Sequence, residues 1–182
     1  MTDDDGRLAQ RAAEGDEHAF RSLVDRHYDA CLRFATLQIG NAADAEDLVQ
    51  ETFVRAYRSL SSYSDEGRFR SWLFRIVVNR CRSLVEKRAR RKSLFEGANL
   101  EARTWATMPE PQDGAPWRPE VERALGALPS DQREAFLLKF VEERSYDEMS
   151  GITGAGVSAL KMRVVRARDH LKRELAELGG VS

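Results

Sequence analysis

Apolar residues recur at helical spacing through most of the chain, and this repeat predicts helices rather than strands. The longest such segment, 69–92, contains no Pro or Gly and is long enough for one continuous helix. Its apolar side carries Phe69, Trp72, Leu73, Ile76, Val77 and Leu84. Its opposite side gathers Ser71, Arg75, Asn79 and Arg82, and the helix ends in basic residues. We expect the first side to join a core and the second to hold phosphate and read bases, as cations and amides do.

Arg80 departs from this pattern, because helical spacing projects it near the middle of the apolar side. A buried cation must either reach the rim or meet a carboxylate. The preceding helices carry most of the acids in this half of the chain. We therefore predict that Arg80 is partly buried and lies within salt-bridge reach of an Asp or Glu of residues 16–51.

Three further helices are predicted before this segment, over 4–14, 16–39 and 42–60. Asp16 is expected to cap the second helix, and Gly40 to end it. The third should bury Ala45, Val49, Phe53, Ala56 and Leu60, and should present Asp47, Gln50, Glu51, Val54 and Arg58 on the other side. The helix dipole accounts for acids in the first turns, but not for this mixed surface deeper in the helix. A protein partner with basic side chains accounts for it better.

The remaining chain divides into two loop-like segments and a second group of helices. Residues 61–68 read as a turn-rich loop, and 93–118, with several Pro and Gly, as a flexible linker in which Trp105 and Trp117 could dock elsewhere. Helices are predicted over 119–127 and 130–142, with Ser130 as N-cap of the second. A short helix opened by a Ser145/Glu148 capping box, a Gly-containing turn and a helix over 156–178 predict a helix-turn-helix.

Composition limits the class of protein. The chain has 182 residues, of which 42% are hydrophobic and 32% charged, with net charge −1, which suits one or two small domains with real cores. No run is long enough to span a membrane, and the N-terminal residues do not resemble a signal peptide. Cys31 and Cys81 are far apart, with no CxxC or clustered His, so we expect reduced thiols and no metal site or disulfide.

Charge is strongly segregated along the chain. Residues 1–52 carry net −7, 61–92 carry +7, 93–155 carry −6 and 156–173 carry +5. A single basic run is usually a solvated surface. Two such runs, each on a predicted amphipathic helix, are better explained by two contacts with one long polyanion.

Four ordered motifs, DAEDLVQETFVRAYRSL, FRSWLFRIVVNRCRSLVEKRARR, LPSDQREAFLLKFVEERSYDEM and VSALKMRVVRARDHL, resemble the extracytoplasmic-function sigma factors of bacterial RNA polymerase, in the sigma-70 family. The resemblance covers roughly 16–92 and 119–178. It implies an all-α protein of two small helical domains: region 2 in 1–92 and the helix-turn-helix region 4 in 119–182, joined by the linker 93–118. The implied function is promoter-specific transcription initiation with core polymerase.

The resemblance also implies roles for individual residues. Asp47, Gln50, Glu51 and Val54 match the surface that binds the polymerase clamp. Tyr63, Ser64, Arg68, Arg75, Asn79 and Arg82 match positions that capture and read the −10 element. Ser158, Lys161, Met162, Arg163 and Arg166 match the helix that reads the −35 element. The expected partners are core polymerase, through clamp and flap, promoter DNA and an anti-sigma factor. A cytoplasmic location is expected, with retention at a membrane only through an anti-sigma factor.

Some residues depart from the family pattern. Ser83 stands where Asp is common, Met162 where Ser is common, and Met149-Ser150-Gly151 replaces Ile-Ala-Glu. Gly151 is expected to weaken its helix, because Gly costs about 1 kcal/mol relative to Ala in a helix interior.

Two other functions remain open on the sequence. A stand-alone helix-turn-helix regulator would bind duplex DNA without polymerase, which leaves the acidic helix and the linker unexplained. A nucleic-acid enzyme would need converging carboxylates, but Asp47 and Glu51 point away from the predicted core. No catalytic residues, metal ligands, cofactor or small-molecule substrate are expected.

Overall fold

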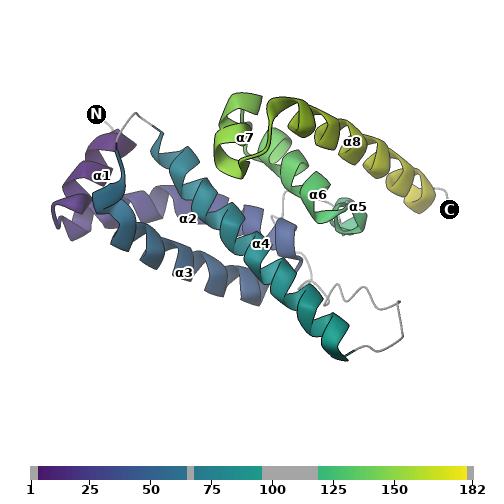
Figure 1. Cartoon of the computed structure of the whole chain (residues 1–182), viewed down its shortest axis with the longest axis horizontal. Coiled ribbons are helices and arrows are strands. Elements are labelled where there is room, and N and C mark those ends of the chain that lie inside the picture. Colours follow the sequence, from purple (N-terminus) through teal and green to yellow (C-terminus); the bar gives the residue numbers. More distant parts are fainter. Residues whose placement is uncertain (1–3, 65–67, 96–118, 180–182) are drawn as a thin grey trace.

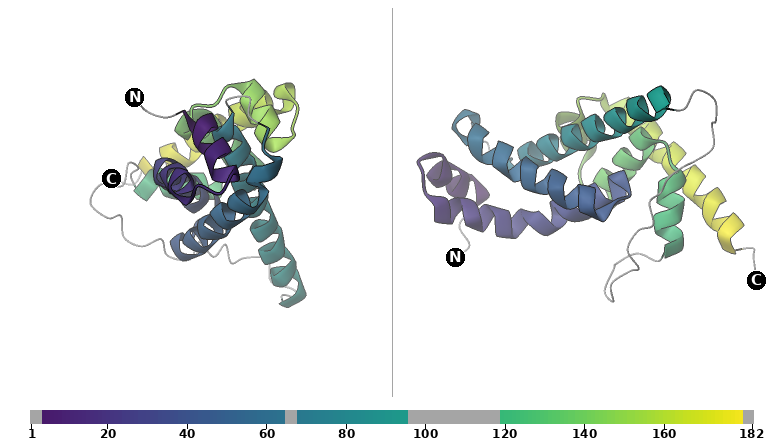
Figure 2. Two further views of the ribbon diagram at one scale, coloured as in Figure 1. Left: turned by 90° about the vertical axis from the view of Figure 1, so that its left-hand side faces the viewer. Right: turned by 90° about the horizontal axis from the view of Figure 1, so that it is seen from below.

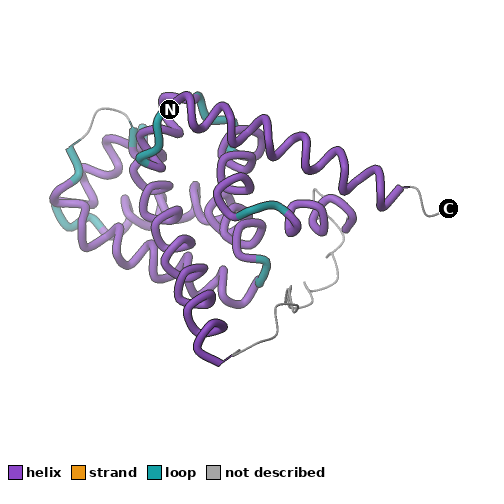
Figure 3. The backbone as a smooth tube through the Cα atoms, turned by 45° about the vertical axis from the view of Figure 1, so that its right-hand side comes forward, coloured by secondary structure: helices purple, strands orange, loops and turns teal. Residues whose placement is uncertain are grey.

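The computed structural model describes residues 4–64, 68–95 and 119–179, without the side chains of 92–95 and 177–179. Every regular element within these ranges is helical, which confirms the predicted all-α fold. Figure 1 shows two groups of helices, α1–α4 and α5–α8, and the tube in Figure 3 shows the short loops that join helices within each group.

The first group contains α1 (Asp5–Ala13), α2 (Glu17–Ile39), α3 (Ala42–Ser59), a 3-10 turn (Leu60–Ser62) and α4 (Phe69–Phe95). The helices α2, α3 and α4 pack against one another, and α1 packs on α2. The predicted buried residues of α3 are all buried, and so are Phe69, Leu73 and Val77 of α4. Phe74 and Val78, which lie outside the predicted apolar side, are also fully buried. Phe74 packs against Phe34 of α2, with 5.6 Å between the ring centroids, so the core of the first group covers more of α4 than periodicity predicted.

Local signals set the ends of α2 as predicted. The Asp16 carboxylate accepts a hydrogen bond from the Ala19 backbone N–H at 3.1 Å and one from Arg11 at 2.6 Å. The Ala19 N–H, followed by Arg11, holds the pKa of Asp16 below its usual value. Gly40 ends the helix at φ 68°, a left-handed conformation in which Gly avoids the steric cost of a side chain.

Both cysteines are buried in the first group and form no disulfide. Burial raises the thiol pKa of Cys31 and raises that of Cys81 to about 12. The thiolate is the reactive form of cysteine. Both side chains therefore serve packing.

The second group contains α5 (Pro119–Ala127), α6 (Ser130–Phe136), a π-helical turn (Leu137–Val141), α7 (Tyr146–Thr153) and α8 (Val157–Gly179). The predicted Ser145/Glu148 capping box is present at the start of α7. The predicted helix over 130–142 is present as α6 and the π-helical turn, but the prediction of Ser130 as its N-cap was wrong. The N-cap is Pro129, and no side chain caps this end. The Ser130 hydroxyl instead lies 3.1 Å from the Gln38 amide nitrogen of α2.

The π-helical turn ends the α6 segment. The Glu142 N–H donates to the Leu137 carbonyl at 3.0 Å, and Glu143 then turns the chain at φ 54°. A left-handed conformation is uncommon for a residue with a side chain. Such π turns frequently occur at functional positions. Here the turn precedes Glu142, whose side chain is completely buried.

The two groups pack directly on each other. The helix α7 lies against α4, and α5 and α6 touch α2. The right-hand view of Figure 2 shows the green helices of the second group partly behind α4, in agreement with these contacts. Residues 93–118, including Trp105 and Trp117, fall almost entirely outside the described residues.

Gly151 does not break α7, which continues to Thr153. Its position is exposed, and a Cβ there would meet only Arg75 Nη2, at the ordinary contact distance of 4.0 Å. Gly151→Ala is therefore expected to raise the free energy of unfolding by about 0.5–1 kcal/mol, measured by urea denaturation.

The matched control is Gly154→Ala, three residues further on. Gly154 ends α7 at φ 74°, so a side chain there is strained although the space is open. The free energy of unfolding of this variant should be lower by about 1–2 kcal/mol. Equal effects of the two substitutions would contradict this account of α7.

Candidate polymerase and nucleic-acid interfaces

Four residues of α3 form an exposed surface on the side opposite to its buried residues. These residues, Asp47, Gln50, Glu51 and Val54, are named here the α3 surface. Val54 is 49% exposed. A shallow groove of about 600 Å³ continues from it. The groove is lined by five apolar or aromatic and three charged residues, Phe20, Val24, Phe53, Val54, Tyr57, Glu17, Arg21 and Arg58. The combination of carboxylates, an amide and adjoining apolar area fits contact with a protein.

Arg80 lies where the sequence predicted. Its guanidinium pairs with the Glu51 carboxylate, and its side chain is 28% exposed. Glu51 also pairs with Arg55 at 3.2 Å. Partial burial acts to raise the pKa of Glu51, but the Arg55 and Arg80 guanidiniums outweigh it and hold that pKa below its usual value.

We expect Arg80→Met to change the free energy of unfolding by less than about 1 kcal/mol, because partly exposed ion pairs contribute little and Met suits the apolar neighbours. Glu51→Ala should cost more, since it leaves the half-buried cation without its carboxylate. Because the folded-state pKa of Glu51 is lowered, the contribution of this pair is present at neutral pH and is lost as the pH falls through that pKa. Urea denaturation of both variants at neutral and acidic pH measures these changes in the free energy of unfolding. A larger decrease for Arg80→Met than for Glu51→Ala would contradict this account of the ion pair.

The loop before α4 and the first turns of α4 surround a pocket of about 670 Å³, named here the Trp72 pocket. It is lined by Ser62, Tyr63, Ser64, Arg68, Ser71, Trp72, Arg75, Asp147, Glu148 and Gly151. Tyr63 is half-buried, with its ring centroid 5.1 Å from that of Trp72 and 5.7 Å from that of Phe69. Tyr63, Ser64, Arg68 and Arg75 were predicted as −10 residues, and the fold brings them together here. Ser71 was predicted on the same side of this helix as Arg75, whereas Trp72 was placed on the apolar side and was not singled out as a site residue.

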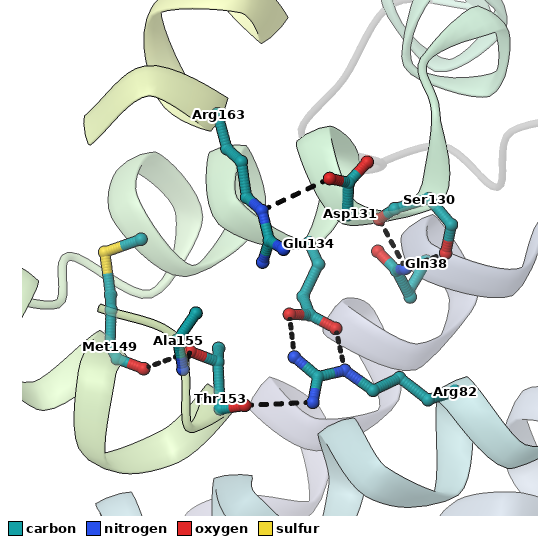
Figure 4. A network of polar contacts seen from close by, with 9 residues as sticks. All are labelled: Gln38, Arg82, Ser130, Asp131, Glu134, Met149, Thr153, Ala155 and Arg163. Carbon is teal, nitrogen blue, oxygen red and sulfur yellow. Dashed lines mark hydrogen bonds and ion pairs between the residues drawn. The ribbon is translucent and has the colours of Figure 1, made fainter. Parts of the chain in front are cut away.

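The α4 face, defined as Arg75, Asn79 and Arg82, is only partly open. Arg75 and Asn79 are exposed and Arg82 is half-buried, and both arginines contact the second group. Arg75 Nε donates to the Gly151 carbonyl at 2.9 Å. Arg82 donates to both Glu134 carboxylate oxygens, at 2.8 and 2.6 Å, and to the Thr153 carbonyl at 3.0 Å (Figure 4). The hydrogen bonds to Glu134 raise the pKa of Arg82.

The second basic surface lies on α8 and follows α7 across the Gly154 turn, as in a helix-turn-helix. Its exposed residues Ser158, Lys161, Met162 and Arg166 are named here the α8 face. Arg163, predicted with them, is half-buried and pairs with Asp131 at 3.2 Å. The Lys161 ammonium lies 5.7 Å from the centroid of the Tyr146 ring.

Sequence reasoning did not single out two buried acids of the second group, Glu134 and Glu142. Their side chains are 3% and 0% exposed. A signal existed for Glu134, which shares helical spacing with the buried Leu137 and Leu138 and so had to be buried. Its partner could not be read from the sequence, because Arg82 belongs to the other helical group.

Metal sites and membrane-spanning helices were also sought among the residues that the structure describes. No group of three or more His, Cys, Asp or Glu side chains there could hold a metal ion. Among the described helices, none combines the length and apolar character needed to cross a membrane.

Two basic helical faces on separate helical groups, one of them in a helix-turn-helix, define a nucleic-acid-binding protein that also presents a surface suited to a protein partner. A family model of sigma-70 region 2 matches residues 23–91, and one of sigma-70 region 4 matches residues 118–171. The RNA polymerase sigma factor NccH of Alcaligenes xylosoxydans xylosoxydans is 35% identical over 177 residues, covering 94% of this chain and 95% of the relative. The ECF RNA polymerase sigma-E factor of Haemophilus influenzae is 30% identical and covers 96% of each chain.

Two solved structures of sigma factors are also similar to this chain in fold and sequence. The structure of CnrH in complex with the cytosolic domain of CnrY has a TM-score of 0.72 and 32% identity, covering 99% of this chain and 100% of that one. The sigma factor RpoE of Bartonella quintana, solved with the anti-sigma factor NepR, has a TM-score of 0.74 and 30% identity, covering 86% and 96%. The chain therefore belongs to the extracytoplasmic-function sigma factors of the sigma-70 family and directs RNA polymerase in transcription initiation.

Proposed function

We propose that this sigma factor divides promoter recognition among three surfaces. The α3 surface binds the polymerase clamp, the Trp72 pocket with the α4 face binds the −10 element, and the α8 face reads the −35 element. The observation that supports this division most is the placement of the two basic faces on different helical groups, with an acidic and apolar surface on a third helix. We also propose that region 2 spans 1–92 and region 4 spans 119–182.

Binding energy alone can drive promoter opening by such a protein. Cations on the α4 and α8 faces supply sequence-independent affinity through phosphate contacts. An unpaired base can stack on Trp72 or Tyr63 in the Trp72 pocket, and stacking stabilises the separated strand by about 1–3 kcal/mol per base. We therefore propose that the chain needs no catalytic residues, cofactor or small-molecule substrate of its own.

The partners follow from the same surfaces. We propose that the clamp meets the α3 surface, that the polymerase flap binds region 4, and that an anti-sigma factor regulates the chain. One relative of known structure was solved with an anti-sigma factor, and another with the cytosolic domain of CnrY. A cytoplasmic location is proposed, where polymerase and promoter DNA are found.

Site-specific photo-crosslinking tests the division of surfaces. A photoreactive amino acid replaces Val54, Ser71 or Met162 in separate variants, and each is assembled with core polymerase and promoter DNA. Val54 should crosslink to polymerase, Ser71 to the −10 strand and Met162 to the −35 duplex. The exposed position Asp25 on α2 serves as the control outside the three surfaces. Crosslinks from Val54 to DNA, or from Met162 to the −10 strand, would contradict the assignment.

A further inference from the structure

Two large apolar side chains are exposed in the middle of the basic surface of α8. Met162 is 50% exposed and Val165 is 48% exposed. Helical spacing places Val165 between Lys161 and Met162 around the helix axis, and Arg166 lies on the other side of Met162. Met162 was predicted as a −35 residue, whereas Val165 was not singled out from the sequence. The two cations of the α8 face therefore flank an apolar centre.

The two side chains do not belong to the core of the second group. The helix α8 packs on α5, α6 and α7 through its other side, which carries the buried residues Leu160, Val164, Ala167 and Leu171. Figure 1 shows α8 along the outer edge of this group. A single exposed apolar residue is common on a protein surface and needs no explanation. Here two of them are neighbours at positions i and i+3 of one helix face.

Their place in the helix-turn-helix limits what they can contact. The N-terminal part of the second helix of this motif contacts base edges in the major groove. Both residues fall within the first three turns of α8, which begins at Val157. The α8 face cannot approach the bases through Lys161 and Arg166 without bringing Met162 and Val165 to the same base edges.

The chemistry of the base edges then selects the contact. Val165 has no hydrogen-bonding group, and the Met162 sulfur is only a weak acceptor. In the major groove the bases present hydrogen-bond donors and acceptors, and the C5-methyl group of thymine is the apolar feature among them. An apolar side chain against any other base edge would leave polar groups of that base without a partner. The pair therefore suits thymine.

We propose that Val165, together with Met162, reads thymine in the −35 element through the C5-methyl group. This inference rests on the proposed −35 role of the α8 face and names part of the sequence that this face selects. Side chains at i and i+3 have Cβ atoms about 5–6 Å apart, so they can reach methyl groups on neighbouring base pairs, which are stacked about 3.4 Å apart. The −35 element of this chain therefore contains two neighbouring A·T base pairs.

The two residues differ in how strictly they select thymine. Val is β-branched, and one side-chain rotamer dominates in a helix, so the methyl groups of Val165 have a fixed position. Met has an unbranched and flexible side chain that adapts to its surroundings. Val165 therefore fixes thymine at one base pair, and Met162 gives a weaker preference at the next.

Selection from randomised DNA tests the identity of the bases. Promoter fragments that the holoenzyme transcribes are randomised over the −35 element, and the sequences that the holoenzyme retains are determined. The unsubstituted chain should enrich thymine, on either strand, at two neighbouring base pairs. Val165→Ala should lose the stricter preference and Met162→Ala the weaker one. Leu175→Ala is the matched control, because it removes another exposed apolar side chain from α8, nearer its C-terminus.

Deoxyuridine isolates the methyl group, since it pairs as thymine does and lacks only the C5-methyl. Gel shifts measure the affinity of the holoenzyme for the selected duplex with thymine or deoxyuridine at the stricter position. Loss of one buried methyl contact should weaken binding by the unsubstituted chain and by Leu175→Ala by about fourfold. Binding by Val165→Ala should change little, because its contact with the methyl is already lost. Equal effects of deoxyuridine on the unsubstituted and Val165→Ala chains would overturn the inference.

The remaining outcomes separate the inference from the proposed function. Ala is a better helix former than Val, so Val165→Ala should keep the helix content of the unsubstituted chain by circular dichroism. Thymine enrichment that persists in both alanine variants and tolerates deoxyuridine would indicate recognition of DNA shape, which overturns the inference but leaves the −35 role of the α8 face. A holoenzyme that enriches no sequence over this element would contradict that role itself, and the inference with it.

Discussion

Replacing Asp47 with lysine is expected to weaken binding to core RNA polymerase by about thirtyfold, equivalent to about 2 kcal/mol. The substitution places a cation on the α3 surface, where we propose that the clamp presents basic groups. Like charges facing each other across an interface disfavour binding, while the exposed position itself adds little to folding stability. Asp47 is the cleaner site for this test than Glu51. Glu51 pairs with Arg55 and Arg80, whereas the Asp47 side chain makes no hydrogen bond or ion pair with the part of the chain that the structure describes.

Surface plasmon resonance with immobilised core polymerase measures this effect. Asp29→Lys is the control, because it makes the same charge change at an exposed position on α2. The loss should be larger for Asp47→Lys and should diminish at high salt, as electrostatic attraction does. Equal affinities of the two variants for core polymerase would show that the α3 surface does not bind the polymerase.

Arg166→Ala and Asn79→Ala are expected to fail at different steps of initiation. Arg166 is exposed on the α8 face, and loss of a two-bond contact to a base costs about 1–3 kcal/mol, which corresponds to about five- to 150-fold in duplex binding. Asn79, exposed on the α4 face, is expected to act only once strands separate. Its removal should leave initial promoter binding intact and reduce opening.

Gel shifts of holoenzyme on duplex promoter DNA report the first step, and permanganate reactivity of promoter thymines reports the second. Arg168→Ala is the control for Arg166, because it removes an exposed arginine from a different side of α8. If both Arg166→Ala and Asn79→Ala impair the same step, the two faces do not divide promoter recognition.

Helical periodicity predicted the helices and the buried residues of α3. The ends of α2 and the capping box of α7 were predictable because each depends on neighbours a few residues away. Arg80 was also predictable, since a cation on an apolar side needs a carboxylate and the nearby helices supply them.

Contacts between the two groups were not predictable from periodicity. Ser130 was expected to cap its own helix, and it instead contacts Gln38. Arg75 and Arg82 were predicted as open DNA contacts, and each contacts region 4. Such pairings join residues more than fifty positions apart and depend on how two independent helical groups meet, which no local pattern records.

Transcription in vitro tests the central claim most directly. Core RNA polymerase is incubated with the purified chain and a library of genomic promoter fragments, and run-off transcripts are mapped. The account predicts transcripts that begin at defined positions, depend on the chain and share −10 and −35 sequences at a fixed spacing. A chain that shifts duplex promoter DNA equally well with and without core polymerase, and yields no chain-dependent transcript, would contradict it and would instead indicate a stand-alone DNA-binding regulator.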